Sequence, residues 1–129
     1  MNSLINGESL SIYGNDYPTK DGTCIRDYIH IEDLAIAHIA ALKKGVSGAF
    51  NLGNGNGYSV KQVIDVCRKI TNHSIPSKVV SPREGDSTIL ISDSTKAKNE
   101  LGWIPKYPDI ESIIASAWEW HKSHPDGYS

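Results

Sequence analysis

The stretch Gly22–Leu34, with the sequence GTCIRDYIHIEDL, passes from a polar turn through a short strand pattern directly into the start of a helix. We predict the strand over Arg26–Ile29. Glu32 or Asp33 then opens a helix that continues to about Lys44. Its residues are apolar on almost every side, so we expect it to need more cover than this chain alone provides.

The rest of the chain shows short strands and helices separated by polar turns. Ser59 and Gln62 form a capping box, and apolar residues then recur at helical spacing from Val60 to Ile70, which predicts a second helix. The other expected elements are strands over Ser9–Tyr13, Ala49–Leu52 and Lys78–Val80, a further strand within Asp86–Ile91, a helix capped by Ser92–Ser94 that ends at Leu101, and a helix from Asp109 to about His124. Gly45 and Gly102 are the predicted stops of the first and third helices. Short strands with four helices indicate an α/β, partly α+β-like, fold class.

Composition limits the class of protein. At 129 residues we expect one domain spanning 1–129, with a modest core because only 39% of the residues are hydrophobic. The formal net charge of −2 does not favour nucleic acid or an anionic membrane as a partner. Cys24 and Cys67 are too few for a disulfide framework, and we find no signal peptide or membrane-spanning run. We therefore expect reduced thiols and a cytoplasmic location.

A glycine-rich loop at Gly53–Gly57 invites comparison with a dinucleotide-binding turn, since it lies between an expected strand and an expected helix. Tyr58, however, stands where the third glycine of that fingerprint should be. No acidic residue ends a second strand about twenty positions further on. The loop is therefore predicted to be a connecting turn, and we expect no cofactor-binding residue in this chain.

Arginine is used only three times, and two of the three lie in unusual contexts. Arg26 lies between the expected strand and helix, and Arg83 lies in a turn-rich segment, whereas Arg68 looks like an ordinary helix-surface residue. A guanidinium binds phosphate through a planar fork that lysine does not reproduce, and a diphosphate has enough oxygens for two such groups. Arg26 and Arg83 are therefore candidates for one anion-binding site.

Each arginine also has a structural alternative. For Arg26 it is a salt bridge to Asp27 or Asp33, and for Arg83 a salt bridge to Glu84. Spacing alone does not separate anion binding from these ion pairs.

Three other kinds of residue have two interpretations. Asp86 could accept hydrogen bonds from a ribose diol or could cap a turn. Tyr13 could face a flat ring or could be a half-buried packing residue. His30 and His38 lie in apolar surroundings that are more typical of hydrogen-bonded core histidines than of ligands.

A resemblance rests on a series of motifs that occur in a fixed order. They are Asn15–Thr19, Arg26–Ile31, Asp33–Ala35, Asn51–Gly53, Arg83–Asp86, Leu101–Trp103, and the final Trp118–His121 and His124–Tyr128. So arranged, they closely resemble the C-terminal part of the UDP-glucose 4-epimerases, which are extended short-chain dehydrogenases/reductases. The resemblance covers nearly the whole chain, from about Leu10 onward. It implies the substrate-binding domain of such an enzyme, without the Rossmann cofactor core.

By this resemblance, Arg26 and Arg83 hold the diphosphate of UDP, and Asp86 binds the ribose. The strand Ser11-Ile12-Tyr13 lies where the family grips uracil, largely through backbone groups. Leu90 lines the hexose pocket near its N-acetyl side, where a bulky residue is expected to disfavour UDP-N-acetylhexosamines. The implied ligands are UDP-glucose and UDP-galactose, in galactose metabolism.

The chain departs from the family in its catalytic equipment. Short-chain dehydrogenase-type enzymes pair a tyrosine with a lysine four residues on, and no tyrosine here is followed by lysine at that spacing. The family reaction uses bound NAD to remove a hydride from C4 of the hexose and return it to the other face. We therefore expect no catalytic or metal-ligating residue, a missing N-terminal NAD-binding domain, and no activity of the chain alone.

Two expectations concern partners and alternatives. The apolar helix ending at Lys44 and the open edge of a Phe50–Leu52 strand predict self-association, as a dimer or by exchange of elements between copies. The alternative functions are a stand-alone nucleotide-sugar binding module, or the same part of another nucleotide-sugar enzyme such as a 4,6-dehydratase.

Overall fold

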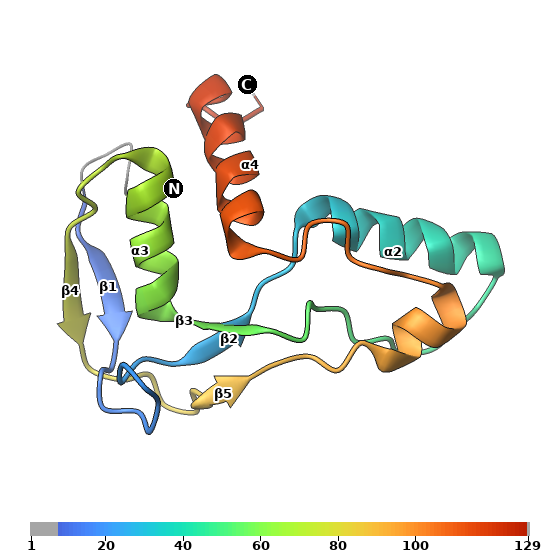
Figure 1. The fold of residues 1–129 in the computed structure, drawn as a ribbon, viewed down its shortest axis with the longest axis horizontal. Coiled ribbons are helices and arrows are strands. Elements are labelled where there is room, and N and C mark those ends of the chain that lie inside the picture. The colour runs from blue at the N-terminus through green and yellow to red at the C-terminus, as the bar shows by residue number, and fades with distance from the viewer. Residues whose placement is uncertain (1–7, 129) are drawn as a thin grey trace.

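The structure is a computed structural model that describes residues 8–128. Its elements, in chain order, are β1 (Leu10–Tyr13), β2 (Ile25–Asp27), α2 (Ile31–Lys44), β3 (Gly57–Ser59), α3 (Val60–Thr71), β4 (Ser77–Val80), β5 (Ile89–Leu90), the π-helical turn η1 (Ala97–Leu101) and α4 (Ile110–Ser123). Figure 1 shows β1, β4 and α3 at one end of the molecule, α2 and η1 at the other, and the short strands β2, β3 and β5 between them. Helix α4 stands beside α3.

Two small sheets organise the strands. β1 and β4 pair in parallel, with Ile12 opposite Val79. In the second sheet the order is β3-β2-β5, antiparallel on the β3 side and parallel on the β5 side. Arg26 is central in this sheet, opposite Tyr58 on one neighbour and Leu90 on the other. The parallel strands and four helical segments confirm the α/β class.

Helix α2 begins earlier than expected, because the residue that caps it is His30 rather than Glu32 or Asp33. The Nδ1 atom of His30 accepts the backbone N–H of Glu32 at 3.1 Å. Asp33 is fully buried, and its carboxylate accepts the backbone N–H groups of Lys106 and Tyr107 at 2.7 and 2.9 Å. The Asp33 side chain therefore holds the loop at Lys106 and Tyr107 in place and does not cap the helix.

The predicted strand at Ala49–Leu52 is wrong, since this segment pairs with no strand in the described part of the chain. Phe50 and Leu52 instead pack against buried residues between α2 and η1. The Lys96 ammonium lies 4.5 Å from the Phe50 ring centroid and donates to the Ala49 carbonyl. The alternation of apolar residues in this segment reflects the packing of Phe50 and Leu52 against the core, not pairing with another strand. The paired strand lies later, at β3, which the sequence did not indicate.

Other local predictions are confirmed. Ser59 and Gln62 form the expected capping box of α3, and Asp109 caps α4 through the backbone N–H of Ser112 at 2.7 Å. Gly45 and Gly102 end their helices in the left-handed region, at φ 61° and 68°. The strand predicted over Arg26–Ile29 is present, although it is shorter and starts one residue earlier.

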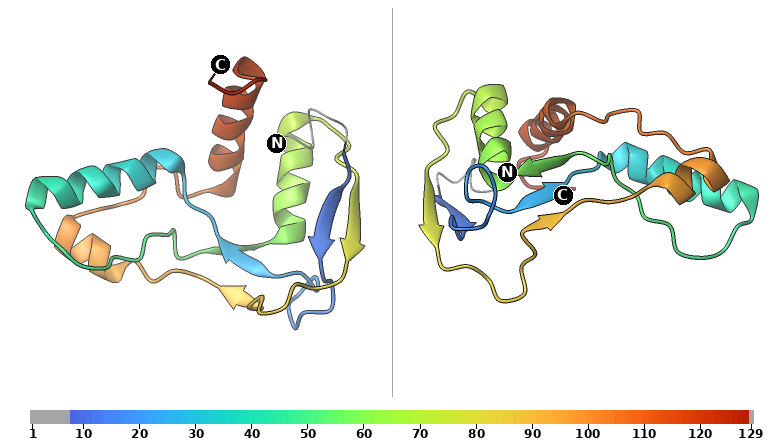
Figure 2. Two further views of the ribbon diagram at one scale, coloured as in Figure 1. Left: turned by 180° about the vertical axis from the view of Figure 1, so that it is seen from behind. Right: turned by 60° about the horizontal axis from the view of Figure 1, so that its bottom comes forward.

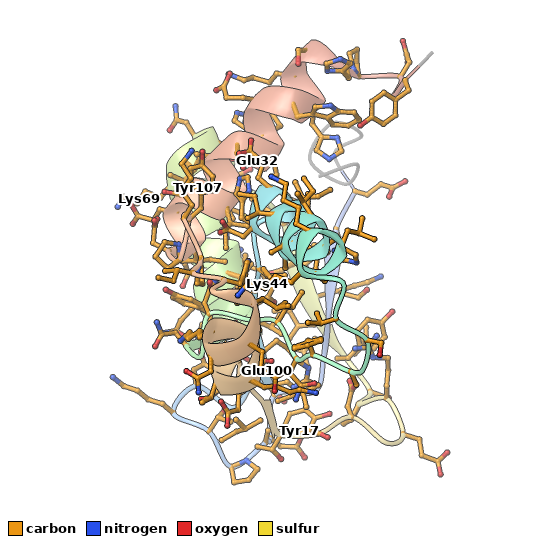
Figure 3. The ribbon with its side chains drawn as sticks, turned by 90° about the vertical axis from the view of Figure 1, so that its right-hand side faces the viewer. Tyr17, Glu32, Lys44, Lys69, Glu100 and Tyr107 are labelled. Carbon is orange, nitrogen blue, oxygen red and sulfur yellow. The ribbon has the colours of Figure 1, made fainter. Side chains whose placement is uncertain are left out.

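A buried cluster between α2 and η1 contains Ala37, Ala97, Leu101 and Trp103. The Trp103 indole N–H donates to the Asp33 carbonyl at 2.8 Å, which ties the cluster to the start of α2. The Lys44 ammonium, which Figure 3 places between α2 and η1, donates to the backbone carbonyl of Glu100 at 2.9 Å. In the left view of Figure 2, no other described segment lies along the opposite side of α2. Its exposed apolar residues are Ile31, Ile36, Ile39 and Leu42.

Candidate anion and sugar site

Four of the predicted site residues meet in one cluster. The Nη2 atom of Arg26 lies 3.5 Å from Oδ1 of Asp86, and Nε of Arg83 lies 3.0 Å from Oδ2 of the same carboxylate. The Arg83 guanidinium also lies over the ring of Tyr13, 4.6 Å from its centroid. Residues from β1, β2 and the β4–β5 loop thus form one surface, which we call the Arg26–Arg83 cluster.

Hydrogen bonds and a tight turn in the local backbone fix the orientation of these side chains. Nη1 of Arg26 donates to the carbonyls of Ile25 and Ser87 at 2.8 and 2.7 Å, so the guanidinium is held against the β4–β5 loop. That loop turns at Gly85, whose φ of 81° favours glycine, and the backbone N–H of Asp86 donates to the Arg83 carbonyl at 3.3 Å. The turn places Asp86 between the two arginines.

The salt bridges that the sequence suggested for the two arginines do not form with the expected partners. Arg26 pairs with neither Asp27 nor Asp33, and Arg83 does not pair with Glu84, because Asp86 serves both guanidiniums. Asp27 and Asp33 are occupied by backbone N–H groups elsewhere. Two guanidiniums share one carboxylate, so the cluster keeps a net positive charge that suits a bound anion.

Exposure differs between the two arginines. The side chains of Arg26 and Asp86 are 23% and 20% exposed, whereas Arg83 is 62% exposed. Arg26 is therefore a fixed wall of the site, and Arg83 is free on one side to contact a ligand.

Arg68 is not an ordinary surface residue, because it donates to the Ile75 carbonyl and ties α3 to the start of β4.

Strand β1 contributes differently along its length. Ser11 and Ile12 precede Tyr13 and lie opposite Lys78 and Val79 of β4. The Ile12 side chain is buried in the core, whereas Tyr13 is 43% exposed. Only the Tyr13 ring makes a contact with the Arg26–Arg83 cluster through its side chain.

A pocket of about 350 Å³ adjoins Arg26, and Leu90 is one of its walls. We call it the β5 pocket. Its other lining residues, which the sequence did not single out, are Asp27, Asn51, Leu52, Ile91, Ser92 and Asp93. The side chain and backbone of Thr95 hydrogen-bond Asp93 and lower the pKa of its carboxyl, so this rim residue is ionised at neutral pH.

The glycine-rich loop does not form a cradle for NAD. The backbone N–H groups of Asn54 and Gly55 donate to the Asp27 carboxylate, so these amides are not available to a pyrophosphate. The N-terminus of α3 beyond it is closed by its own capping box. The loop therefore connects to β3 and α3 without offering the Asn54 or Gly55 amide to a pyrophosphate.

The two histidines have different surroundings. His30 is buried, and its Nε2 lies 2.7 Å from Oγ of Ser116, as expected of a hydrogen-bonded core histidine. His38 is exposed on α2, so its predicted core position is wrong. Within residues 8–128, no three His, Cys, Asp or Glu side chains gather in a way that could hold a metal ion. No helix in that range is long and apolar enough to cross a membrane.

Comparison with known proteins agrees with this chemistry. The family model described as GDP-mannose 4,6 dehydratase matches residues 4–116. The UDP-glucose 4-epimerase of Halalkalibacterium halodurans is 56% identical over 126 residues, covering 95% of this chain and 38% of the relative. A crystal structure of UDP-glucose 4-epimerase superposes with a TM-score of 0.91 at 47% identity, covering 99% of this chain and 40% of that one. The Bifidobacterium longum UDP-glucose 4-epimerase in complex with NAD+ and UDP gives 0.88 at 38% identity, with coverage of 98% and 39%.

The chain belongs to the family of this model, GDP-mannose 4,6 dehydratase, within the extended short-chain dehydrogenases/reductases. It is similar to UDP-glucose 4-epimerases and spans 38% to 40% of the length of the first two relatives named above.

Proposed function

We propose that this chain is the UDP-binding part of a UDP-glucose 4-epimerase and corresponds to the C-terminal, substrate-binding domain of that enzyme. The observation that carries the proposal is the meeting of Arg26, Arg83 and Asp86, which come from distant parts of the sequence. Two guanidiniums within reach of one carboxylate match the charge and the size of a diphosphate.

The proposed roles follow the order of the groups in UDP-glucose. Arg26 and Arg83 bind the diphosphate, and the Asp86 carboxylate accepts hydrogen bonds from the ribose hydroxyls. The backbone of Ser11 and Ile12, with the ring of Tyr13, contacts uracil. Tyr13 lies against Arg83, which supports placing the base next to the phosphates. The hexose would lie in the β5 pocket, beside Leu90.

The chain is proposed to bind its ligand without converting it. Epimerisation needs NAD held against a proton-transferring group, and the Asn54 and Gly55 amides of the glycine-rich loop are bound to Asp27 instead of being open to a pyrophosphate. We therefore propose that the NAD-binding domain is supplied by the rest of the enzyme, and that the chain alone is inactive.

A titration with nucleotides tests the proposal. UDP is expected to bind weakly, because one wall of the site would belong to the cofactor domain. Replacing either arginine, as Arg26→Ala or Arg83→Ala, is expected to weaken UDP binding about tenfold, since each loses a charge-assisted contact. Arg68→Ala is the matched control, because it removes the same charge from a residue that bonds Ile75 and Ser77 instead.

The same titration separates the alternatives. Equal affinity of the unaltered chain and both arginine variants for UDP contradicts the shared diphosphate site. Tighter binding of GDP or dTDP than of UDP favours another nucleotide-sugar enzyme, such as the 4,6-dehydratase after which the matched family model is described.

A further inference from the structure

Asp27 has an unusual set of partners for a strand residue. Its carboxylate accepts the backbone N–H groups of Asn54 and Gly55, each at 3.0 Å, and of Ser92 at 3.2 Å. These donors belong to two segments far apart in sequence, the β3-side loop and the stretch that follows β5. One carboxylate side chain therefore joins three segments through hydrogen bonds.

The packing around this carboxylate is tight. A Cβ atom added to Gly53 would lie 2.4 Å from Oδ2 of Asp27 and 2.6 Å from Cβ of Ser92, so only glycine fits there. The Ser94 hydroxyl donates to the Gly53 carbonyl at 2.7 Å in a buried position. The loop is thus held against Asp27 from both sides, and its position depends on that side chain.

The same three segments form the walls of the β5 pocket. Arg26 and Asp27 come from β2 and its end, Asn51 and Leu52 precede the glycine loop, and 90–93 includes the end of β5 and the residues after it. Polar groups suit the hydroxyls of a sugar, and leucine and isoleucine suit its C–H faces. Arg26 links the pocket to the Arg26–Arg83 cluster, so a group in the pocket lies next to a bound phosphate.

We infer that Asp27 is a positioning residue for the sugar end of a nucleotide-sugar ligand: it shapes the β5 pocket without contacting the nucleotide end. This inference rests on the proposed function and adds the residue that supports sugar binding. A pocket whose walls are fixed in advance loses less conformational entropy when the ligand binds. Asp27 fixes the walls of the β5 pocket in advance, because its carboxylate holds the 53–55 loop and Ser92 together.

Comparing the UDP-glucose to UDP affinity ratio between variants isolates this contribution, because the charge difference between the terminal phosphate of UDP and the esterified phosphate of UDP-glucose is the same for every variant. The unaltered chain is expected to bind UDP-glucose more tightly than UDP. In Asp27→Asn, an amide NH₂ replaces one accepting oxygen and faces backbone donors. We expect about a fivefold loss of UDP-glucose affinity, with UDP affinity changed by less than about twofold.

Asp21→Asn is the matched control. Asp21 is also a carboxylate that accepts a hydrogen bond from a backbone N–H, that of Thr23, but it lies in the loop before β2, bonds Ser59 at the start of α3, and does not line the β5 pocket. This change is expected to lower stability while leaving the ratio of the two affinities unchanged. A general loss of packing would instead affect both variants alike.

The outcomes separate the inference from the proposed function. If the unaltered chain binds neither ligand, the proposed function fails. If UDP binds but UDP-glucose binds no better, or if Asp27→Asn lowers both affinities in parallel or neither, the positioning role is overturned and UDP binding stands.

A second measurement does not depend on the variant folding. In amide NMR spectra of the unaltered chain, UDP-glucose is expected to shift the Asn54, Gly55 and Ser92 signals more than UDP does. Equal shifts with the two ligands overturn the inference.

Discussion

Arg26 shows how a single charged residue can be fixed on a small protein. Its guanidinium donates to two carbonyls and faces Asp86, so a residue only 23% exposed keeps its polar atoms satisfied. A diphosphate that binds here competes with Asp86 for part of the guanidinium fork. The two arginines are thus held in position before any ligand arrives, which reduces the cost of ordering them.

Leu90 is a single side chain whose effect on sugar selectivity can be tested. It lies opposite Arg26 across the sheet, is 62% exposed and lines the β5 pocket, where its bulk is proposed to exclude an N-acetyl group. Leu90→Ala is expected to raise the affinity for UDP-N-acetylglucosamine relative to UDP-glucose by about fivefold, as the space of several methyl groups is released. Competitive titration of the two ligands measures the ratio.

Ile89 is the control for Leu90. It is the preceding residue of β5, is similarly exposed and points to the other face of the strand. Ile89→Ala should leave the ratio of affinities unchanged. An unchanged ratio in Leu90→Ala would remove Leu90 from the sugar site.

At the scale of elements, the start of α3 is tied to the loop before β2. Asp21 accepts hydrogen bonds from the backbone N–H and hydroxyl of Thr23 and from the hydroxyl of Ser59, the residue that caps α3. Burial acts to raise the pKa of Asp21, but hydrogen bonds from Ser59 and Thr23, with the charge of Lys61, lower it below its usual range.

This lowered pKa predicts how stability depends on pH. A carboxyl whose pKa is lower in the folded state stabilises the fold above its unfolded pKa, and that contribution is lost as pH falls through the folded pKa. The free energy of unfolding should therefore decline as pH falls below about 5, past the unfolded pKa of about 3.9 and on through the lower folded pKa, and less steeply in Asp21→Asn. Urea denaturation at several pH values measures both curves.

Part of the decline is expected to remain in that variant. Hydrogen bonds from Thr95 and Ser112 also lower the pKa values of Asp93 and Asp109. Identical curves for Asp21→Asn and the unaltered chain would show that Asp21 does not stabilise the loop through its charge.

At the scale of the whole molecule, apolar surface is left without cover. One side of α2 exposes Ile36, Ile39 and Leu42, and a groove of about 560 Å³ between α2 and α4 is lined by residues that include Ile113 and Trp120. Such surfaces are normally buried against another element or another chain. We therefore propose that copies of this chain self-associate through α2. The strand edge expected at Phe50–Leu52 does not contribute, because no strand forms there.

Sedimentation velocity over a range of concentrations tests this proposal. Mass above that of the monomer is expected at high concentration, and Leu42→Glu should shift the equilibrium toward monomer by about tenfold, because a charge would be buried at the contact. Ile104→Glu is the control, since Ile104 is 76% exposed but lies on the corner after η1. A clean monomer of the unaltered chain at high concentration would contradict self-association.

Features that depend on neighbouring residues could be predicted from the sequence. The capping box at Ser59 and Gln62, the Asp109 cap and the glycine stops at 45 and 102 all form as predicted, because their hydrogen bonds or backbone angles are set within a few positions. The unusual contexts of Arg26 and Arg83 also predicted that these two arginines belong together, and both lie beside Asp86.

Features that depend on distant contacts emerged from the folded structure and could not be predicted from neighbouring residues. It brought Arg26 and Arg83 to Asp86, gave the cap of α2 to His30, left Phe50–Leu52 unpaired, and joined Asp27 to loops on two sides. Nothing within a few residues of Asp27 indicates its donors, Asn54, Gly55 and Ser92. The physical reason is that a buried charged or apolar group takes whichever partner the fold brings near it, and sequence spacing does not encode that choice.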